Sequence, residues 1–280
     1  MECNIDICLK TGDFIMIKII FSDMDGTLLD ENGNLPVEFP EVMAELKKRG
    51  VIFAPSSGRQ YFALLEQMGE YKNEFMFLAE NGAFNIYKEK EICSSVLDMD
   101  LVHRVIAEAD KQHIFAILCG KKNAYVRKEW EPYIHEARRF FTHSIFVDSF
   151  DDVDDEFVKI AFADCEGLDA EHNLMPVLTQ FEPEQQVSLS SNYWVDILNP
   201  GINKGWAIKH IQERFGFKPE ECAAFGDYMN DYEMMQSVHY SYAMENAYPE
   251  LKKVARFTTK SNVEHGVIYQ IKEFIKQGLI

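Results

Sequence analysis

Residues 19–29 read Ile19-Ile20-Phe21-Ser22-Asp23-Met24-Asp25-Gly26-Thr27-Leu28-Leu29, an apolar run that turns directly into two aspartates. A fully buried parallel strand has an apolar run of this kind, and ligands of open α/β sheets bind beyond the carboxyl ends of such strands. Side chains two residues apart in an extended segment point to the same side, so Asp23 and Asp25 can reach one site. The stretch therefore predicts a parallel strand that ends in an acidic site.

These two carboxylates predict a bound cation. Two like charges held this close repel each other unless a cation or a shared proton offsets the repulsion. Magnesium is the natural choice, because proteins bind it through one or two carboxylates, with water and substrate phosphate completing the octahedron. A solvated, aspartate-rich turn is the alternative, and this motif alone does not decide between the two.

Composition places the chain among soluble globular proteins. Its 280 residues suffice for one large or two modest domains, and 47% of them are hydrophobic and 26% charged. No apolar run approaches the ~18 residues that span a bilayer, and the first residues lack the pattern of a signal peptide. The six cysteines are scattered without CxxC spacing, which favours reduced thiols over disulfides or a zinc site. We therefore expect a cytoplasmic protein without a membrane partner.

The net charge of −18 excludes nucleic acid as an expected partner, since nucleic-acid binding depends on Lys and Arg that neutralise phosphates. The same charge repels a phosphorylated metabolite at long range. Any site for such a metabolite must be built locally, from a metal, a few cations and helix N-termini.

The pattern of apolar segments predicts two domains. Residues 1–15 are expected to be an extension that precedes the true start at Met16. An α/β pattern covers residues 16–83, changes to an α+β texture over 84–189, and resumes near the strand Trp194–Leu198. Within the α+β segment we expect a hairpin strand at 84–87, a strand at 157–163, and helices over 131–140 and 170–181. We therefore predict a doubly wound, mostly parallel α/β core from residues 16–83 and 190–280, with an α+β cap, 84–189, inserted into it.

Three more polar motifs follow short apolar segments. Ser56-Ser57-Gly58-Arg59 lies between a predicted strand and a helix, where it forms either a phosphate cradle or a simple helix cap. Lys204 begins a predicted helix, an unfavourable place for a cation that indicates a function. A third acidic cluster, Gly226-Asp227-Tyr228-Met229-Asn230-Asp231, again follows an apolar strand.

In this order, DMDGT at Asp23, SSGR at Ser56, Lys204 and GDYMND at Gly226 resemble the haloacid dehalogenase superfamily of phosphatases. ENGA at Glu80, AMENA at Ala243 and the large α+β insertion resemble its Cof-type branch, whose members mostly hydrolyse sugar phosphates and other small organic phosphates. The resemblance implies a Rossmann-like core with a cap, and a magnesium-dependent phosphatase acting on a small phosphorylated metabolite.

The resemblance also implies roles for the acidic residues. Asp23 would be the nucleophile that forms an aspartyl-phosphate, and Asp25 would be the general acid and base. Magnesium would be held by Asp23, the backbone carbonyl of Asp25, and Asp227. Asp231 would orient either Lys204 or a metal-bound water.

Further residues are expected to bind the phosphoryl group. Ser57 would donate a hydrogen bond to it from the loop that also contains Gly58 and Arg59, Lys204 would neutralise its charge, and Asn230 would help to hold it. Arg59 either contacts substrate or only fixes the loop.

Three questions stay open from the sequence. The cap aromatics Tyr125, Trp130, Tyr193 and Trp194 either line the cleft or belong to the cap's core. A phosphomutase and a non-catalytic regulatory protein on this fold are the alternatives to a phosphatase. A monomer or weak homo-oligomer is expected.

Overall fold

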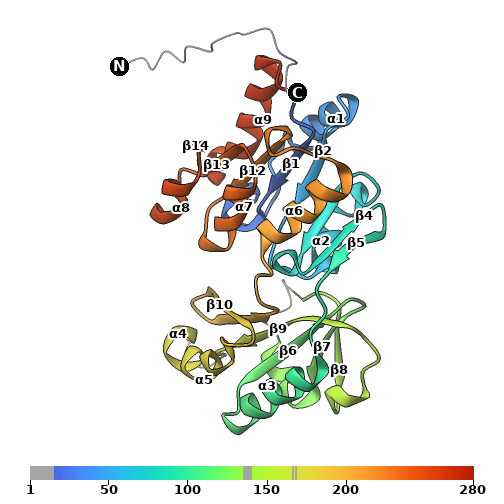
Figure 1. Ribbon diagram of the computed structural model, residues 1–280, viewed down its shortest axis with the longest axis vertical. Helices are drawn as coiled ribbons and strands as arrows, with labels where there is room; N and C mark the ends of the chain where they lie inside the picture. The colour runs from blue at the N-terminus through green and yellow to red at the C-terminus, as the bar shows by residue number, and fades with distance from the viewer. Residues whose placement is uncertain (1–15, 135–140, 166, 168) are drawn as a thin grey trace.

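The computed structural model describes residues 16–134, 141–165, 167 and 169–280. The expected extension, 1–15, lies outside these residues. Figure 1 shows two parts, one above the other: the upper part contains both ends of the described chain, and the lower part contains its middle. We call the upper part the core (16–94 and 199–280) and the lower part the cap (95–198).

The core is built on a parallel sheet with the strand order β14-β13-β12-β1-β2. These strands are β1 (Ile19–Ser22), β2 (Ile52–Pro55), β12 (Cys222–Gly226), β13 (Tyr240–Ala243) and β14 (Phe257–Thr258). Strand β1 lies between β12 and β2, parallel to both. All four of its residues are completely buried, and the first three are apolar. The predicted doubly wound α/β core is confirmed.

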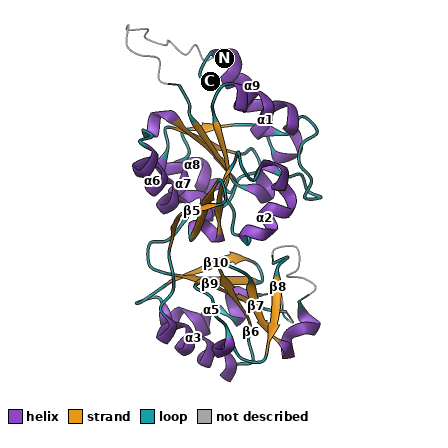
Figure 2. Cartoon of the chain, turned by 90° about the vertical axis from the view of Figure 1, so that its right-hand side faces the viewer, coloured by secondary structure: helices purple, strands orange, loops and turns teal. Residues whose placement is uncertain are grey.

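Helices cover both faces of this sheet. Figure 2 shows α1 (Phe39–Lys48), α2 (Tyr61–Met68) and α9 (Gly266–Gln277) on one side. On the other side lie α6 (Lys204–Phe215), α7 (Tyr232–Ser237) and α8 (Pro249–Val254). The inner strands β1 and β12 are thereby shielded from water, and the polar residues of the motifs are left at the strand ends.

A hairpin extends the core where the cap was expected to begin. Strands β3 (Met76–Ala79), β4 (Phe84–Tyr87) and β5 (Lys90–Ser94) form an antiparallel sheet, which Ser56 and Leu78 join to the edge of the parallel sheet. Phe84, Ile86 and Ile92 contribute to the hydrophobic cluster of the core. The boundary expected at residue 84 is therefore wrong, because a hairpin pattern does not specify the surface against which the hairpin packs.

The cap is a six-stranded sheet with the order β10-β11-β9-β6-β7-β8, in which β7 and β8 are parallel and the other neighbours antiparallel. Its strands are β6 (Phe115–Gly120), β7 (Ala124–Arg127), β8 (Ser144–Val147), β9 (Phe157–Ala163), β10 (Gln186–Ser191) and β11 (Trp194–Leu198). Helices α3 (Met99–Lys111), α4 (Ala170–Asn173) and α5 (Met175–Leu178) share one hydrophobic cluster with this sheet.

Strand β11 corrects the other predicted boundary. It was expected to resume the core at residue 190, but it lies between β10 and β9, antiparallel to both. Both faces of β11 are buried, so its sequence resembles a parallel core strand. The helix expected over 170–181 is divided into α4, α5 and a further turn, with Pro176 at the start of α5. Most of the helix expected over 131–140 lies outside the described residues.

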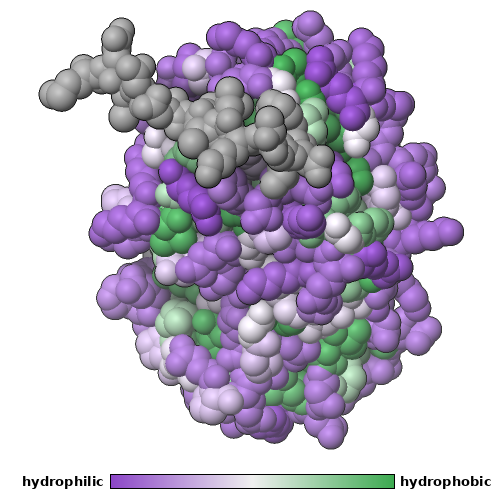
Figure 3. Space-filling model, turned by 45° about the horizontal axis from the view of Figure 1, so that its top comes forward, coloured by the Kyte–Doolittle hydropathy of each residue, from purple (hydrophilic) through white to green (hydrophobic). Residues whose placement is uncertain are grey.

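None of the described helices combines the length and the apolar character needed to cross a bilayer. The face shown in Figure 3 is mostly hydrophilic, and its hydrophobic residues form separate small areas. The four described cysteines, Cys93, Cys119, Cys165 and Cys222, are free thiols.

Candidate active site

A cavity of about 460 Å³ lies between the core and the cap, beyond the carboxyl ends of β1, β2 and β12. The core lines it with Asp23, Asp25, Ser57, Gly58, Arg59, Asn81, Asp227, Tyr228 and Asn230. The cap lines it with Phe141, Lys159, Ser190, Ser191, Asn192, Tyr193, Trp194 and Asp196. The structure therefore brings seven of the nine predicted site residues to one cavity, and Lys204 and Asp231 lie directly behind it.

Lys204 is held between two carboxylates. Its ammonium group donates to Asp23 Oδ1 at 2.5 Å and to Asp231 Oδ1 at 2.6 Å, and the side chain is completely buried. The other carboxylate oxygen of Asp231 accepts the backbone N–H of Asp227 at 3.0 Å. These carboxylates offset the unfavourable position of a cation at the start of α6. Of the two roles considered for Asp231, the geometry favours the orientation of Lys204.

Asp23, Asp227 and Asp231 bring carboxylate oxygens within 4.8 Å of one another. Burial raises the pKa of Asp23 well above its ordinary value, although the charge of Lys204 opposes the shift. Burial and the neighbouring charge of Asp231 raise the pKa of Asp227 to about 6. Three carboxylates against one ammonium leave excess negative charge, and the donors are all oxygen. This set fits a hard divalent cation held by Asp23 and Asp227, since Asp231 is engaged with Lys204.

The turn after β1 is shaped around Asp227. Thr27 Oγ1 donates to Asp227 Oδ1 at 2.7 Å. Gly26 has a φ of 77°, and a Cβ atom there would lie only 2.4 Å from Asp227 Oδ2. Glycine is therefore required at position 26 both for its backbone conformation and for the approach of Asp227.

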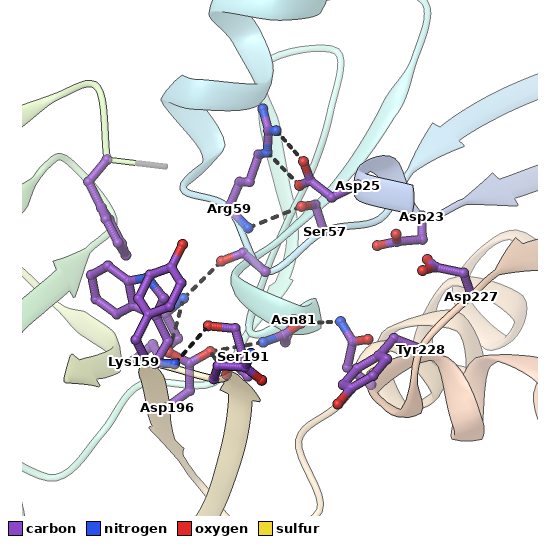
Figure 4. A pocket seen from close by; sticks show the side chains of 17 residues that line it. Asp23, Asp25, Ser57, Arg59, Asn81, Lys159, Ser191, Asp196, Asp227 and Tyr228 are labelled. Atoms are coloured by element: carbon purple, nitrogen blue, oxygen red, sulfur yellow. Dashed lines mark hydrogen bonds and ion pairs between the residues drawn. The ribbon is translucent and has the colours of Figure 1, made fainter. Parts of the chain in front are cut away.

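The Asp25 side chain is directed toward Arg59. Arg59 Nε and Nη2 donate to the two carboxylate oxygens of Asp25 at 2.8 and 2.5 Å. In Figure 4 this pair lies apart from Asp23 and Asp227, whose carboxylates face each other. Arg59 Nη1 also donates to Gln67 at 3.0 Å. These contacts support a role for Arg59 in fixing the loop and Asp25, one of the two roles considered for it.

The loop between β2 and α2 is held by a turn that follows β3. The backbone N–H groups of Asn81 and Glu80 donate to the carbonyls of Ser57 and Arg59 at 2.9 and 3.1 Å. Glu80 and Asn81 adopt left-handed φ angles of 52° and 54°, which turn the chain so that both N–H groups reach the loop. The expected phosphate-binding loop is thus fixed from behind.

Sequence reasoning missed three cavity residues that join the cap to the core. Asn81 accepts a hydrogen bond from Asn230 at 3.3 Å and donates to Asp196 at 3.2 Å. Lys159 lies 2.7 Å from Glu80 and 3.7 Å from Asp196. Burial acts to lower the pKa of Lys159, but the two carboxylates raise it overall. For two of these residues a signal was available, because each is a charged residue inside an apolar strand: Lys159 in FVKIAFA and Asp196 in WVDIL.

Comparison with known proteins agrees with this geometry. The sequence profile of the haloacid dehalogenase-like hydrolases matches residues 20–271. The chain belongs to this family. The 5-amino-6-(5-phospho-D-ribitylamino)uracil phosphatase YbjI of Escherichia coli is 30% identical to this hydrolase over 93% of the chain and 97% of the relative. Relatives named as phosphatases and the family match make this hydrolase a phosphatase, which rules out the non-catalytic alternative.

Solved structures share the whole architecture of this hydrolase. SMU.1108c from Streptococcus mutans has a TM-score of 0.83 at 27% identity and covers 93% of this chain and 99% of its own. The haloacid dehalogenase subclass IIB sugar phosphatase BT4131 has a TM-score of 0.78 at 24% identity, over 94% of this chain and all of its own. The second likeness concerns the fold alone.

The cap side of this hydrolase's cavity is partly aromatic. Trp194 and Tyr193, together with Phe141, line it. The other two candidate aromatics lie in the cap's interior, where Tyr125 contacts Phe157 and Trp130 contacts Phe115. Two of the four aromatics considered from the sequence therefore face the cavity.

Proposed function

We propose that this hydrolase is a magnesium-dependent phosphatase that acts on small phosphorylated metabolites, with sugar phosphates as the expected class, through an aspartyl-phosphate on Asp23. The observation that carries the proposal is the Asp23–Lys204 pair beside Asp227, at the floor of a cavity roofed by the cap. Magnesium would be held by Asp23, Asp227 and the Asp25 carbonyl, and when bound it would neutralise negative charge on the phosphoryl group.

The chain's own residues would perform the first step as follows. A carboxylate oxygen of Asp23 attacks phosphorus, and the bond from phosphorus to the ester oxygen breaks. Asp25 gives its proton to the departing alkoxide. Lys204 lies 2.5 Å from Asp23 and reduces the repulsion between the carboxylate and the phosphate dianion.

The second step would return Asp23 to its starting state. Asp25, now ionised, takes a proton from water as the water oxygen attacks phosphorus. The bond between Asp23 and phosphorus breaks, and inorganic phosphate leaves. Ser57, the N–H groups of its loop and Asn230 hold the phosphoryl oxygens in both steps.

The size and lining of the cavity support a small substrate. Hydroxyl and amide groups from Ser190, Ser191 and Asn192, beside the aromatic rings of the cap, face the space that remains for the leaving group. Such groups suit a polyhydroxylated leaving group. The YbjI relative is named for a phosphorylated ribityl compound, which is consistent with a sugar-like or polyol ester.

Phosphate release from a panel of sugar and polyol phosphates tests the proposal. The panel is run after chelation, after magnesium is restored, and with and without a sugar bisphosphate. We expect magnesium-dependent release without bisphosphate. Transfer between sugar positions that requires bisphosphate would instead identify the phosphomutase, and full activity after chelation would contradict the metal dependence.

Asp227→Ala, with Asp154→Ala as its control, tests the metal site. Asp227 belongs to the buried acidic cluster, whereas Asp154 is fully exposed on the cap. Asp227→Ala should abolish turnover or raise the magnesium requirement, and Asp154→Ala should change neither. We also propose that the protein is a cytoplasmic monomer or weak homo-oligomer. The net charge of −18 supports the absence of nucleic-acid partners.

A further inference from the structure

The loop expected to bind phosphate has three successive carbonyls, and each accepts a hydrogen bond from a group outside the loop. The Ser57 carbonyl accepts from the N–H of Asn81 at 2.9 Å, and the Arg59 carbonyl accepts from the N–H of Glu80 at 3.1 Å. Both of these donors belong to the core. The carbonyl between them, on Gly58, accepts from the ammonium group of Lys159 at 2.8 Å, and Lys159 lies on strand β9 of the cap.

Lys159 is built into this position rather than resting on the surface. Lys159 and Glu80 are each only 1% exposed, and their charged groups lie 2.7 Å apart. Asp196, another cap residue, lies 3.7 Å from the same ammonium group. A buried lysine is costly unless such partners surround it, and the partners fix where its remaining proton donor points.

We propose that Lys159 is a positioning residue of the cap that completes the phosphate-binding loop by holding the Gly58 carbonyl. Phosphoryl binding in the core then depends on a docked cap. The inference deepens the proposed function and rests on it for the identity of the loop as a phosphate site.

The physical reason lies in the peptide that joins Gly58 to Arg59. A peptide group is planar, so fixing its carbonyl behind the loop also fixes its N–H direction. The Arg59 N–H of this peptide donates to Ser57 Oγ at 3.1 Å. Without Lys159, the peptide keeps that contact but loses the partner of its carbonyl, so it can rotate more freely. A rotated peptide no longer presents its N–H group in one direction, and the loop loses preorganisation for an anion.

The test uses a double variant and two single variants. Glu80→Met with Lys159→Met removes the Gly58 contact without leaving a buried, unpaired Glu80 carboxylate. Glu80→Gln removes the charge pair but keeps Lys159 on the Gly58 carbonyl. Lys121→Met is the matched control, because Lys121 also joins the cap to the core, at 3.1 Å from Glu91, but distant from the loop contacts.

Two measurements are made on each full-length variant. Calorimetry gives the dissociation constant of inorganic phosphate in the presence of magnesium, and hydrogen exchange gives the protection of amides 58–60 without any ligand. The double variant should bind phosphate about tenfold more weakly or worse, as expected for loss of a hydrogen bond from a charged donor, and should exchange these amides faster. Glu80→Gln and Lys121→Met should stay near the parent protein in both.

A folded double variant with parental phosphate affinity and parental exchange would overturn the inference, as would an equal loss in Lys121→Met. If the apolar pair disrupts folding, Glu80→Gln with Lys159→Gln serves instead, because the shorter glutamine side chain does not span the distance to Gly58. If the parent releases phosphate from no ester, the proposed function is wrong, while exchange in the ligand-free proteins still decides the role of Lys159.

Discussion

Charged side chains at the floor of the cavity hold one another in place, and none of them acts alone. Lys204 bridges Asp23 and Asp231, and Asp231 also accepts the backbone N–H of Asp227. Loss of one member leaves a buried charge without its partner, which costs more than the interaction itself contributes. At the scale of single residues, the site is therefore one unit whose members cannot be exchanged independently.

Gly26→Ala tests how closely the turn after β1 fits Asp227. Alanine at a positive φ costs roughly 1–2 kcal/mol, and its methyl group would also displace the Asp227 carboxylate. Gly33→Ala is the matched control, because Gly33 has a similar φ of 78° with nothing within 4 Å of the added Cβ. Both variants should lose stability in thermal unfolding, and Gly26→Ala should lose more because of its contact with Asp227. Only Gly26→Ala should raise the magnesium concentration needed for half-maximal activity, and equal magnesium curves would contradict the placement of Asp227.

The pKa of Asp227 predicts a dependence of stability on pH in the chelated protein. Its folded-state pKa of about 6 lies above the ordinary value of 3.8, so the folded state binds the proton more tightly than the unfolded state does. The contribution of Asp227 to stability is therefore present below pH 4 and lost as the pH rises to 6. Melting temperatures of the chelated proteins should fall more over this range in the parent than in Asp227→Asn, where only Asp23, whose pKa is also raised, still contributes to the loss. Saturating magnesium should reverse that loss.

The sequence predicted the motif residues because each follows an apolar strand or begins a helix, where polar groups gather at one sheet edge. Asn81, Lys159 and Asp196 were missed because their role depends on contact between core and cap. Their partners lie far away along the chain, as the 101 residues between Gly58 and Lys159 illustrate. Local pattern does not encode such pairings.

Among the secondary-structure elements, helix α6 carries Lys204 to the site. Asn203 caps the helix by accepting the N–H of Trp206 at 2.8 Å, which fixes the start of the helix immediately before Lys204. Gly205 lies so close to α7 that an added Cβ would be 2.6 Å from the Glu233 backbone. The start of this helix is therefore set by its N-cap and by close packing.

Asn203→Ala should affect both stability and catalysis. Loss of an N-cap costs about 1 kcal/mol, and a shift of Lys204 should lower kcat by about tenfold or more. Asp98→Ala is the control, because Asp98 caps α3 in the cap by accepting the N–H of Leu101 at 3.1 Å. Denaturant unfolding should show similar losses in both variants. If kcat fell equally in both, the link between the α6 cap and Lys204 would have to be given up.

The type and position of most helices and strands could be predicted, but not always the sheet that each strand joins. The strands at 84–87, 157–163 and 194–198 have the expected bounds, yet two of these three belong to a different part of the molecule than expected. Strand β11 is buried on both faces, so its residues resemble those of a parallel core strand. Strand pairing is decided by tertiary packing, which a short apolar run does not specify.

At the scale of the whole molecule, the cap closes the cavity and supplies eight of the 17 residues that line it. Trp194 and Trp130 belong to the same hydrophobic cluster of the cap, but only Trp194 lines the cavity. Specificity should therefore follow the cavity-facing aromatic residues of this cluster, Trp194 among them.

Trp194→Phe, with Trp130→Phe as its control, tests this division. Trp194 is 6% exposed and Trp130 5% exposed, so the two changes remove similar buried surface. Trp194→Phe should change KM among sugar, polyol and nitrophenyl phosphates, with kcat for the nitrophenyl ester little affected. Trp130→Phe should lower the melting temperature without altering the order of substrates. A reordered substrate preference in Trp130→Phe would show that the cap acts through its overall stability instead.

The central claim, that Asp23 receives the phosphoryl group and Asp25 serves as acid and base, is tested most directly by rapid mixing of Asp25→Asn with nitrophenyl phosphate. Nitrophenolate departs largely without an acid, but attack of water on the aspartyl-phosphate loses its general base, worth about 10²–10⁴ in rate. We predict a burst of nitrophenolate equal to the enzyme concentration, slow turnover, and phosphate trapped on Asp23, with neither burst nor turnover in Asp23→Asn. Linear release from Asp25→Asn without modification of Asp23, or turnover by Asp23→Asn, would contradict it.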